Sequence, residues 1–306
     1  MVRDSSPKVK IEGPYDTDET LNDFEFELIT TDDFAATAST NTRRESIFGR
    51  DDDEAILAPV SGQRSSRIAG TTSFSAMDRY FDTNDLKSSV RTYLRRLESL
   101  VLPSQGLGWR VTDEVRNKSY DPTTDRGFLI SDMTWQHSAS NPNSIEWDVE
   151  FEQADGVQDG ITPEDYITRR GMQDVGRDRV VVDGVEIEFA EVDTRRIERS
   201  ISINSNDLIH QSEEEEGDSP VLGVIETGME TEVTFNGTVF VPNSFESTIQ
   251  SFDTELHGKE ADLYDELSGT IWTGTITSSS STINAGEPAN RFDFSIDLEV
   301  GDVVTG

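Results

Sequence analysis

The residues able to perform chemistry in this sequence lack the spacing that a catalytic or metal site needs. The histidines, His137, His210 and His257, have no second histidine or cysteine at metal-ligand spacing. The chain has no glycine-flanked hydrolase serine, no phosphate-binding Gly-Lys-Ser loop and no dinucleotide-binding glycine pattern. Carboxylate pairs are so frequent in this acidic chain that they do not indicate acid–base catalysis. We therefore predict no enzymatic activity, no catalytic residues and no cofactor.

Two blocks of consecutive acids are the strongest candidates for cation binding. Neither block has the ligand spacing of an EF-hand calcium loop. A solvated acidic loop accounts for each of them without a ligand, so we favour solvated loops and predict no metal site. The residues of the two blocks are Asp51, Asp52, Asp53, Glu54, Glu213, Glu214, Glu215 and Glu216.

Acidic residues dominate the whole chain, with 61 Asp and Glu against 26 Lys and Arg and a formal net charge of −35. In molar salt the Debye length falls to about 3 Å, which screens the self-repulsion of such a surface. The composition indicates a halophilic protein, haloarchaeal or from a virus of such a host; an ordinary acidic protein is the alternative. The charge disfavours binding to nucleic acid backbones and anionic membranes. No apolar run approaches the ~20 residues that span a bilayer, so we expect no membrane insertion.

Strand periodicity is the main structural signal. Apolar and polar residues alternate in "FEFELIT" from Phe24, in "SIEWDVEFEQ" from Ser144 and in "RFDFSIDLEV" from Arg291. In "VVVDGVEIEFAEV" the Asp183-Gly184 pair predicts a two-residue hairpin turn. Strands of this kind form sheets with one apolar and one wet face.

Helices are expected where two segments open with Phe-Asp-Thr, at Phe81 and at Phe252. The first is predicted to run from Asp82 to Val101, capped by Asp82 or Thr83. Its apolar face has helical spacing and consists of Leu86, Val90, Tyr93, Leu94, Leu97, Leu100 and Val101. The second is predicted to have a shorter apolar face and to stop at Gly269. That face consists of Leu263, Tyr264 and Leu267.

The order strand, acidic block, strands, helix, strands occurs twice, which predicts a duplicated unit. We place the first unit at residues 1–157, a linker at 158–179 and the second unit at 180–306. The alternative is that β-rich chains repeat such patterns without duplication.

Arginines precede both acidic blocks, in "RRESIFGR" and "RRIERSISIN". These stretches are expected to act as arms between subunits, because guanidinium groups pair well with carboxylates across an interface. The candidate contacts are Arg43, Arg44, Arg195 and Arg196. Pairing within one chain is the alternative.

The segments "RIAGTTSF", Asp82 to Val101 and "SIEWDVEFEQ", with their second copies, resemble the tail-tube fold of tailed viruses. The resemblance covers Phe24 to Phe151 and Val180 to Val300. It implies a mainly β fold with packed helices (α+β), made of two tandem tail-tube-like β-barrel or sandwich units that each carry one amphipathic helix.

The resemblance further implies a structural virion protein that forms a homo-oligomeric ring, trimer or hexamer, at the tail tip or baseplate. Its partners would be its own copies and other tail proteins, with DNA only passing through the lumen. Assembly would take place in the host cytoplasm. A duplicated tail-tube subunit is one alternative. Another is a halophilic carbohydrate-binding or cell-surface β-sandwich module that uses Trp109, Trp135, Trp147 and Trp272 as sugar platforms.

Overall fold

The computed structural model describes most of the chain as strands of one sheet. The described residues are 9–15, 24–29, 35–40, 64–102, 105, 108–114, 117–122, 128–153, 163, 167, 175–204, 225–241, 245–283 and 290–301. The sequence-based expectation of a mainly β protein with packed helices is confirmed.

The strands fall into two units, here called the first and the second unit. Strands of the first unit are β1 Val9–Tyr15, β2 Glu25–Leu28, β3 Ala35–Thr40, β4 Arg64–Ser73, β5 Gly108–Asp113, β6 Lys118–Tyr120, β7 Phe128–Ser138 and β8 Ser144–Gln153. Strands of the second unit are β9 Arg179–Val182, β10 Val185–Glu188, β11 Glu191–Asn204, β12 Ile225–Phe240, β13 Glu260–Asp265, β14 Thr270–Thr282 and β15 Arg291–Val300.

The strand order is the same in both units. The first reads β2-β1-β5-β7-β8-β4-β3, and the second reads β10-β9-β13-β14-β15-β12-β11. Strand β6, which pairs only with β5, has no counterpart. In both units the helices follow the fourth strand, β4 or β12. Each strand of the second unit can therefore be matched to one strand of the first.

A local irregularity occurs at the same place in both units. The pairing of β7 with β8 shifts register between Ile130 and Asp132, opposite Phe151. The pairing of β14 with β15 shifts between Ile276 and Ser278, opposite Leu298. A β-bulge bends its strand and changes the direction of nearby side chains, and bulges are usually conserved among related folds. The shared bulge fixes the residue-by-residue match, with Ile130 corresponding to Ile276.

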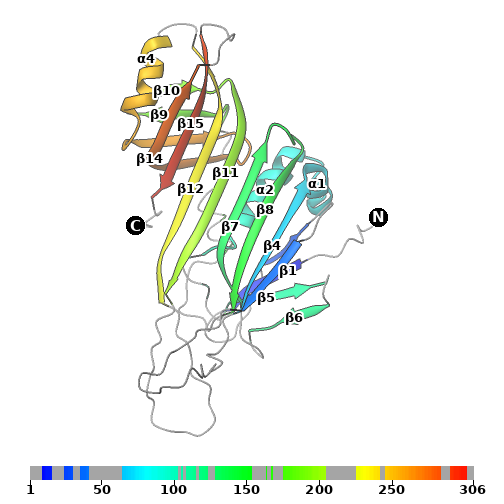
Figure 1. Cartoon of the computed structure of the whole chain (residues 1–306). Coiled ribbons are helices and arrows are strands. Elements are labelled where there is room, and N and C mark those ends of the chain that lie inside the picture. Colours follow the sequence, from blue (N-terminus) through cyan, green and yellow to red (C-terminus); the bar gives the residue numbers. More distant parts are fainter. Residues whose placement is uncertain are drawn as a thin grey trace, which may run out of the picture.

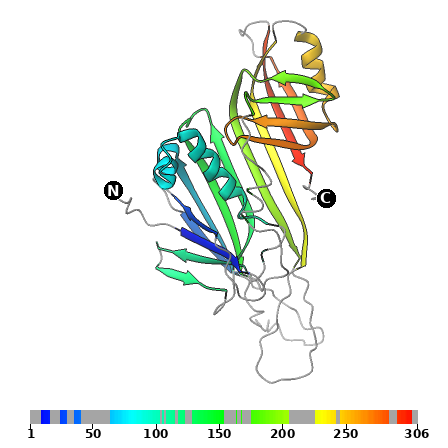
Figure 2. The same ribbon diagram turned by 180° about the vertical axis from the view of Figure 1, so that it is seen from behind.

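The sheet folds back on itself within the second unit. Strand β14 pairs with β13 through residues 270–275 and with β15 along most of its length, so it belongs to both layers. Figure 2 shows β9, β10 and β13 crossing over the long strands β11 and β12. Between these layers lie Phe189 and Phe294, whose ring centroids are 4.2 Å apart.

The helices differ from the sequence-based expectation. In the first unit the helix predicted from Asp82 to Val101 is the shorter α2 Leu86–Glu98, and its cap is Asp85 rather than Asp82 or Thr83. A helix that was not predicted, α1 Phe74–Phe81, precedes it and ends at Asp82, which adopts a left-handed conformation. Val90, Tyr93, Leu94 and Leu97 face the core as predicted, whereas Leu86 is 49% exposed. Figure 1 shows both helices on one side of the first unit.

The predicted second helix over Leu263 and Tyr264 is wrong. Residues 260–265 form strand β13, held between β9 and β14. The helix of this unit precedes the predicted place: α4 Phe245–Gln250 continues into the π-helical turn η1 Ser251–Glu255. The Asp183-Gly184 hairpin is confirmed, with positive φ at both residues.

Candidate functional site

The two units meet edge to edge, through the antiparallel pair β7–β11. Seven residues of β11, from Thr194 to Ser200, pair with β7 from Ser138 to Asp132. A further backbone hydrogen bond runs from the Ala139 N–H to the Asp193 carbonyl, at 2.7 Å. The strands of both units thus form one continuous sheet, which Figure 1 shows as β4, β8, β7, β11, β12 and β15 side by side. We call the β7–β11 pair and the side chains packed beside it the join.

Helix α2 of the first unit binds the β13–β14 turn of the second. Arg91 Nη2 donates to the Glu266 carbonyl at 2.9 Å, and Arg95 Nη2 donates to the Gly269 carbonyl at 3.0 Å. Gly269 has φ +68°, and a Cβ there would lie 2.8 Å from Arg91 Nε. The glycine therefore provides both the turn conformation and the space for the arginine.

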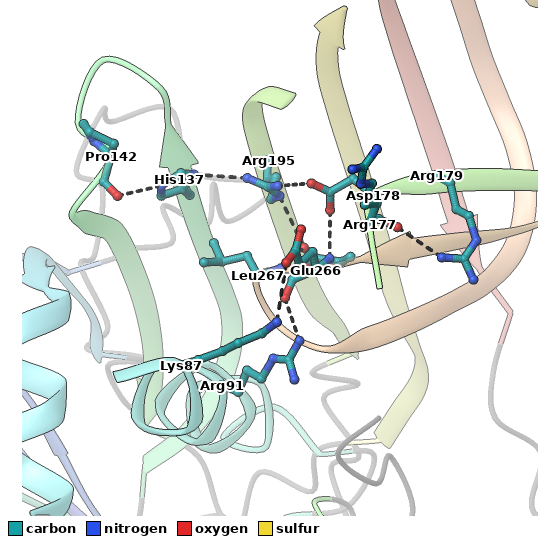
Figure 3. A network of polar contacts seen from close by, with 11 residues as sticks. Lys87, Arg91, His137, Pro142, Arg177, Asp178, Arg179, Arg195, Glu266 and Leu267 are labelled. Atoms are coloured by element: carbon teal, nitrogen blue, oxygen red, sulfur yellow. Dashed lines mark hydrogen bonds and ion pairs between the residues drawn. The ribbon is translucent and has the colours of Figure 1, made fainter. Parts of the chain in front are cut away.

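Arg195 is the centre of the polar network at the join (Figure 3). Its guanidinium contacts the Asp178 carboxylate and lies 3.3 Å from Asp265 Oδ1. It also bonds His137 Nδ1 of the first unit at 3.3 Å. Lys87 Nζ on α2 reaches Glu266 Oε1 at 3.4 Å. Because this network links β7, β11 and α2 with the β13–β14 turn, it fixes how the two units sit against each other.

Burial shapes the titration of this network. It raises the pKa of Asp178 above its usual range, with the Asp265 charge acting in the same direction and the Arg195 cation opposing it. Burial also lowers the pKa of His137, whose ring stacks on that of Phe74 with the centroids 5.8 Å apart. Three residues of the network, Lys87, Arg195 and Glu266, line a cavity of about 390 Å³ between α2 and the second unit.

The sheet face turned away from the apolar core, here called the outer face, is acidic across both units. Adjacent strands place its side chains side by side. Its described cations include Arg67, which pairs with Asp148, Arg196, which pairs with Glu198, and Arg291, which lies 3.8 Å from Glu191 Oε2. The carboxylates are those of Asp132, Glu146, Asp148, Glu150, Glu198, Glu230, Glu232, Asp293, Asp297 and Glu299.

Asp132 is the most perturbed acid of this face. Burial and the charges of Glu198, Glu150 and Asp148 raise its pKa to about 6. The perturbation lies beside the join, where carboxylates from β7, β8 and β11 crowd together.

The distal half of β14, residues 277–282, has one open edge. Strand β13 pairs with β14 only as far as Thr275, and no described strand covers the rest of that edge. The open edge is in contact with η1 instead: Asp253 Oδ1 accepts from the Ser281 N–H at 3.1 Å and from Ser281 Oγ at 2.7 Å. In the first unit the matching part of β7 is the part that forms the join.

The residues predicted to contact other subunits fall into two groups, those outside the described residues and those that pair within this chain. Arg43 and Arg44, and the acidic blocks 51–54 and 213–216, lie outside the described residues. Arg195 and Arg196 form ion pairs within this chain, which is the alternative that the sequence left open. The stretch 195–204, expected to be an arm, is instead part of the sheet, as strand β11.

Sequence reasoning missed Lys87, Arg91, Arg95, Asp178, Asp253 and Glu266. One signal was present: Arg91 and Arg95 are four residues apart on an otherwise apolar helix face, where a cation needs a buried partner.

Other candidate sites are not supported by the described residues. All four tryptophans are buried, so none offers a platform for a sugar. No cluster of metal-binding side chains occurs in the described part of the chain. Among the same residues, no helix is both long and apolar enough to cross a membrane.

Comparison with protein-family models and with curated proteins finds no match for this chain.

Proposed function

We propose that this chain is a structural protein of the tail of a halophilic virus and that its copies assemble into a ring at the tail tip or baseplate. The two units are tandem copies of a tail-tube-like module. Partners are further copies of the chain and neighbouring tail proteins, and DNA passes through the lumen without binding.

One observation carries this proposal: the join inside the chain has the form of a contact between subunits. Two units of the same strand order meet head to tail, through the edge of β7 in one and the edge of β11 in the other. A head-to-tail contact leaves a free edge at each end, so it continues from copy to copy and closes when the rotation allows. A ring is the simplest way to cover both ends.

The outer face supports a channel that carries DNA. In a ring closed through the sheet, this face turns either to the lumen or to the exterior. A lumen lined by carboxylates repels phosphates and lets DNA slide. The described outer-face arginines Arg67, Arg196 and Arg291 each pair with an acid of the same face.

The first experiment is to measure the mass of the purified chain by sedimentation and by mass photometry in 3 M KCl. We expect a closed species of three or six chains, seen as rings by electron microscopy. A monomer at every protein concentration in molar salt would overturn the proposal. The high-salt origin is tested separately: stability unchanged between 0.1 M and 3 M KCl would contradict it.

A further inference from the structure

We propose that the open edge of β14 pairs antiparallel with β3 of a second copy, and that Asp253 covers this edge until the partner strand arrives. The inference rests on the proposed function, because it names the contact through which copies join. It also specifies a register, which makes it testable residue by residue.

Both edges are free within the described residues. Strand β3 pairs with β4 on one side and has no described strand on the other. Strand β14 pairs with β15 along residues 278–282, and its other side is open there. The two edges lie at opposite ends of the continuous row β3-β4-β8-β7-β11-β12-β15-β14. One chain therefore cannot pair its own two edges, whereas two copies can.

The join provides the template for this contact. Strand β7 corresponds to β14, and β11 corresponds to β3, in the matched strand orders. Since β7 and β11 pair inside the chain, the same step from unit to unit places β3 of the next copy beside β14. The inferred contact is thus a repeat of one that the fold already makes.

The register follows from the matched residues of both strands. Counting from the bulges, Met133 corresponds to Ser279 and His137 to Ile283. In the first unit, Met133 pairs with Val149 of β8, which pairs with Ile68 of β4. In the second unit, Ser279 pairs with Ile296 of β15, which pairs with Phe235 of β12.

On the next strand, Ile68 pairs with Ala36 of β3 and Phe235 pairs with Arg195 of β11. Ala36 and Arg195 therefore also occupy corresponding positions. Because Arg195 faces His137 at the join, Ala36 should face Ile283, and Ser39 should face Ser280. The contact would also cover Ile283, whose side chain is 58% exposed in the single chain.

The composition of the edges supports pairing. Free edges are commonly protected by charged side chains, which prevent unwanted pairing. Strand β2 has Glu25 and Glu27, and strand β10 has Glu186 and Glu188. By contrast, residues 35–40 and 277–282 contain no charged residue and no proline, in a chain of net charge −35. The two edges that the template brings together are the two without this protection.

Asp253 supplies the missing protection on the β14 side. The Ser281 N–H points out of the open edge, where Asp253 Oδ1 accepts its hydrogen bond. In the inferred register that N–H belongs to the backbone ladder with Ala38 of the second copy. The carboxylate must release it before the strands pair, and release frees the charge to be solvated. Asp253 therefore competes with assembly and raises the protein concentration at which rings form.

The register is tested by cysteine cross-linking. Because the chain has no cysteine of its own, only the introduced cysteines can form disulfides. Ser39 and Ser280 form a non-hydrogen-bonded pair in this register, with Cα atoms about 4.5 Å apart, which suits a disulfide. We expect the double variant S39C/S280C to give covalent oligomers up to the ring size after mild oxidation in 3 M KCl. The matched control, T37C/S280C, is two residues out of register at about 7–8 Å and should cross-link weakly.

The outcomes separate the two proposals. If the wild type forms no oligomer, the ring itself is wrong. If it forms rings but S39C/S280C stays monomeric on denaturing gels while its circular dichroism is native, the ring stands and this contact is wrong. Stronger cross-linking of T37C/S280C than of S39C/S280C would overturn the register.

The role of Asp253 is tested by the variant Asp253→Ala. Because it removes a charged hydrogen-bond acceptor from the edge, we expect assembly at roughly tenfold lower protein concentration. The control is Asp262→Ala, which removes a partly exposed acid that bonds a β14 side chain, Thr273, away from the open edge. Equal assembly midpoints for Asp253→Ala and wild type would exclude a protective role for Asp253.

Discussion

Strands β7 and β14 occupy the same place in their units and bend at the same bulge, yet their inward side chains differ. Met133 and Trp135 of β7 are fully buried under α2, and Trp135 Nε1 donates to Glu98 Oε1 at 3.1 Å. The matching residues of β14, Ser279 and Ser281, are only partly buried and bond the short η1 turn. The same backbone plan thus accommodates a thick apolar layer in one unit and a thin polar layer in the other.

This difference separates what the strand order requires from what each unit does with it. The strand order, the bulge and the position of the helix are common to both units. The depth of the core and the pairing of the outer edge are not. The join forms where the edge is backed by α2, whose arginines bind the second unit. The open edge remains where the helix is short and lacks such residues within the described range.

Replacing a fully buried residue of β7 by its counterpart in β14 should have the largest effect on the free energy of unfolding. Trp135→Ser replaces a fully buried indole by the residue type found at the matching Ser281. Loss of the ring and of its bond to Glu98 should lower the free energy of unfolding by about 4 kcal/mol. Urea denaturation in 3 M KCl measures it. A loss below about 1 kcal/mol would mean that the first unit does not depend on its thicker core.

The join should be the next most sensitive region. Arg199 is fully buried and donates from Nη1 to the Glu98 carbonyl at 2.5 Å, linking β11 to the end of α2. We expect Arg199→Ala to cost about 3 kcal/mol, from the lost packing and the polar groups left unpaired.

The control for that variant lies on the same strand. Arg196 is exposed and pairs with Glu198 on the outer face, so Arg196→Ala should cost less than about 1 kcal/mol. Both are measured by urea denaturation, with separate tryptophan and circular dichroism readouts. A similar loss of unfolding free energy in Arg199→Ala and Arg196→Ala would show that the buried arginine at the join stabilises the protein no more than an exposed one.

The smallest expected effect is electrostatic and concerns the outer face beside the join. Asp132 has its pKa raised from 3.8 to about 6, whereas the matching Ser278 is uncharged. The folded chain therefore binds a proton more readily than the unfolded one, and stability falls as pH rises from about 4 to about 6.

Asp132→Asn should remove this dependence and stabilise the protein at pH 7. The gain should be about 1 kcal/mol at most, because the carboxylate is partly solvated and molar salt screens it. The difference in melting temperature between pH 5 and pH 7 is measured for both proteins. An unchanged pH dependence in the variant would show that Asp132 is not the group that titrates.

Much of the β architecture could be predicted from local pattern. Alternation in 144–153 and 291–300 predicted β8 and β15 with their buried faces, and Asp183-Gly184 predicted the hairpin. The candidate site could be predicted less well. Arg195 was singled out, but its partners Asp178 and Asp265 are 17 and 70 positions away in the chain, and no local pattern indicates which acids it meets.

The sequence by itself determined that the chain is acidic, mainly β and patterned twice, because composition and side-chain alternation are local properties. Only the tertiary structure decided that residues 260–265 are a strand: Leu263, Tyr264 and Leu267 fit a helical face, but β9 and β14 supply hydrogen bonds on both sides of Ala261 to Tyr264. It alone decided which strand edge is used in the join and which is left open. Strand pairing joins residues far apart in the chain, and such partners are selected by the packing of the whole fold.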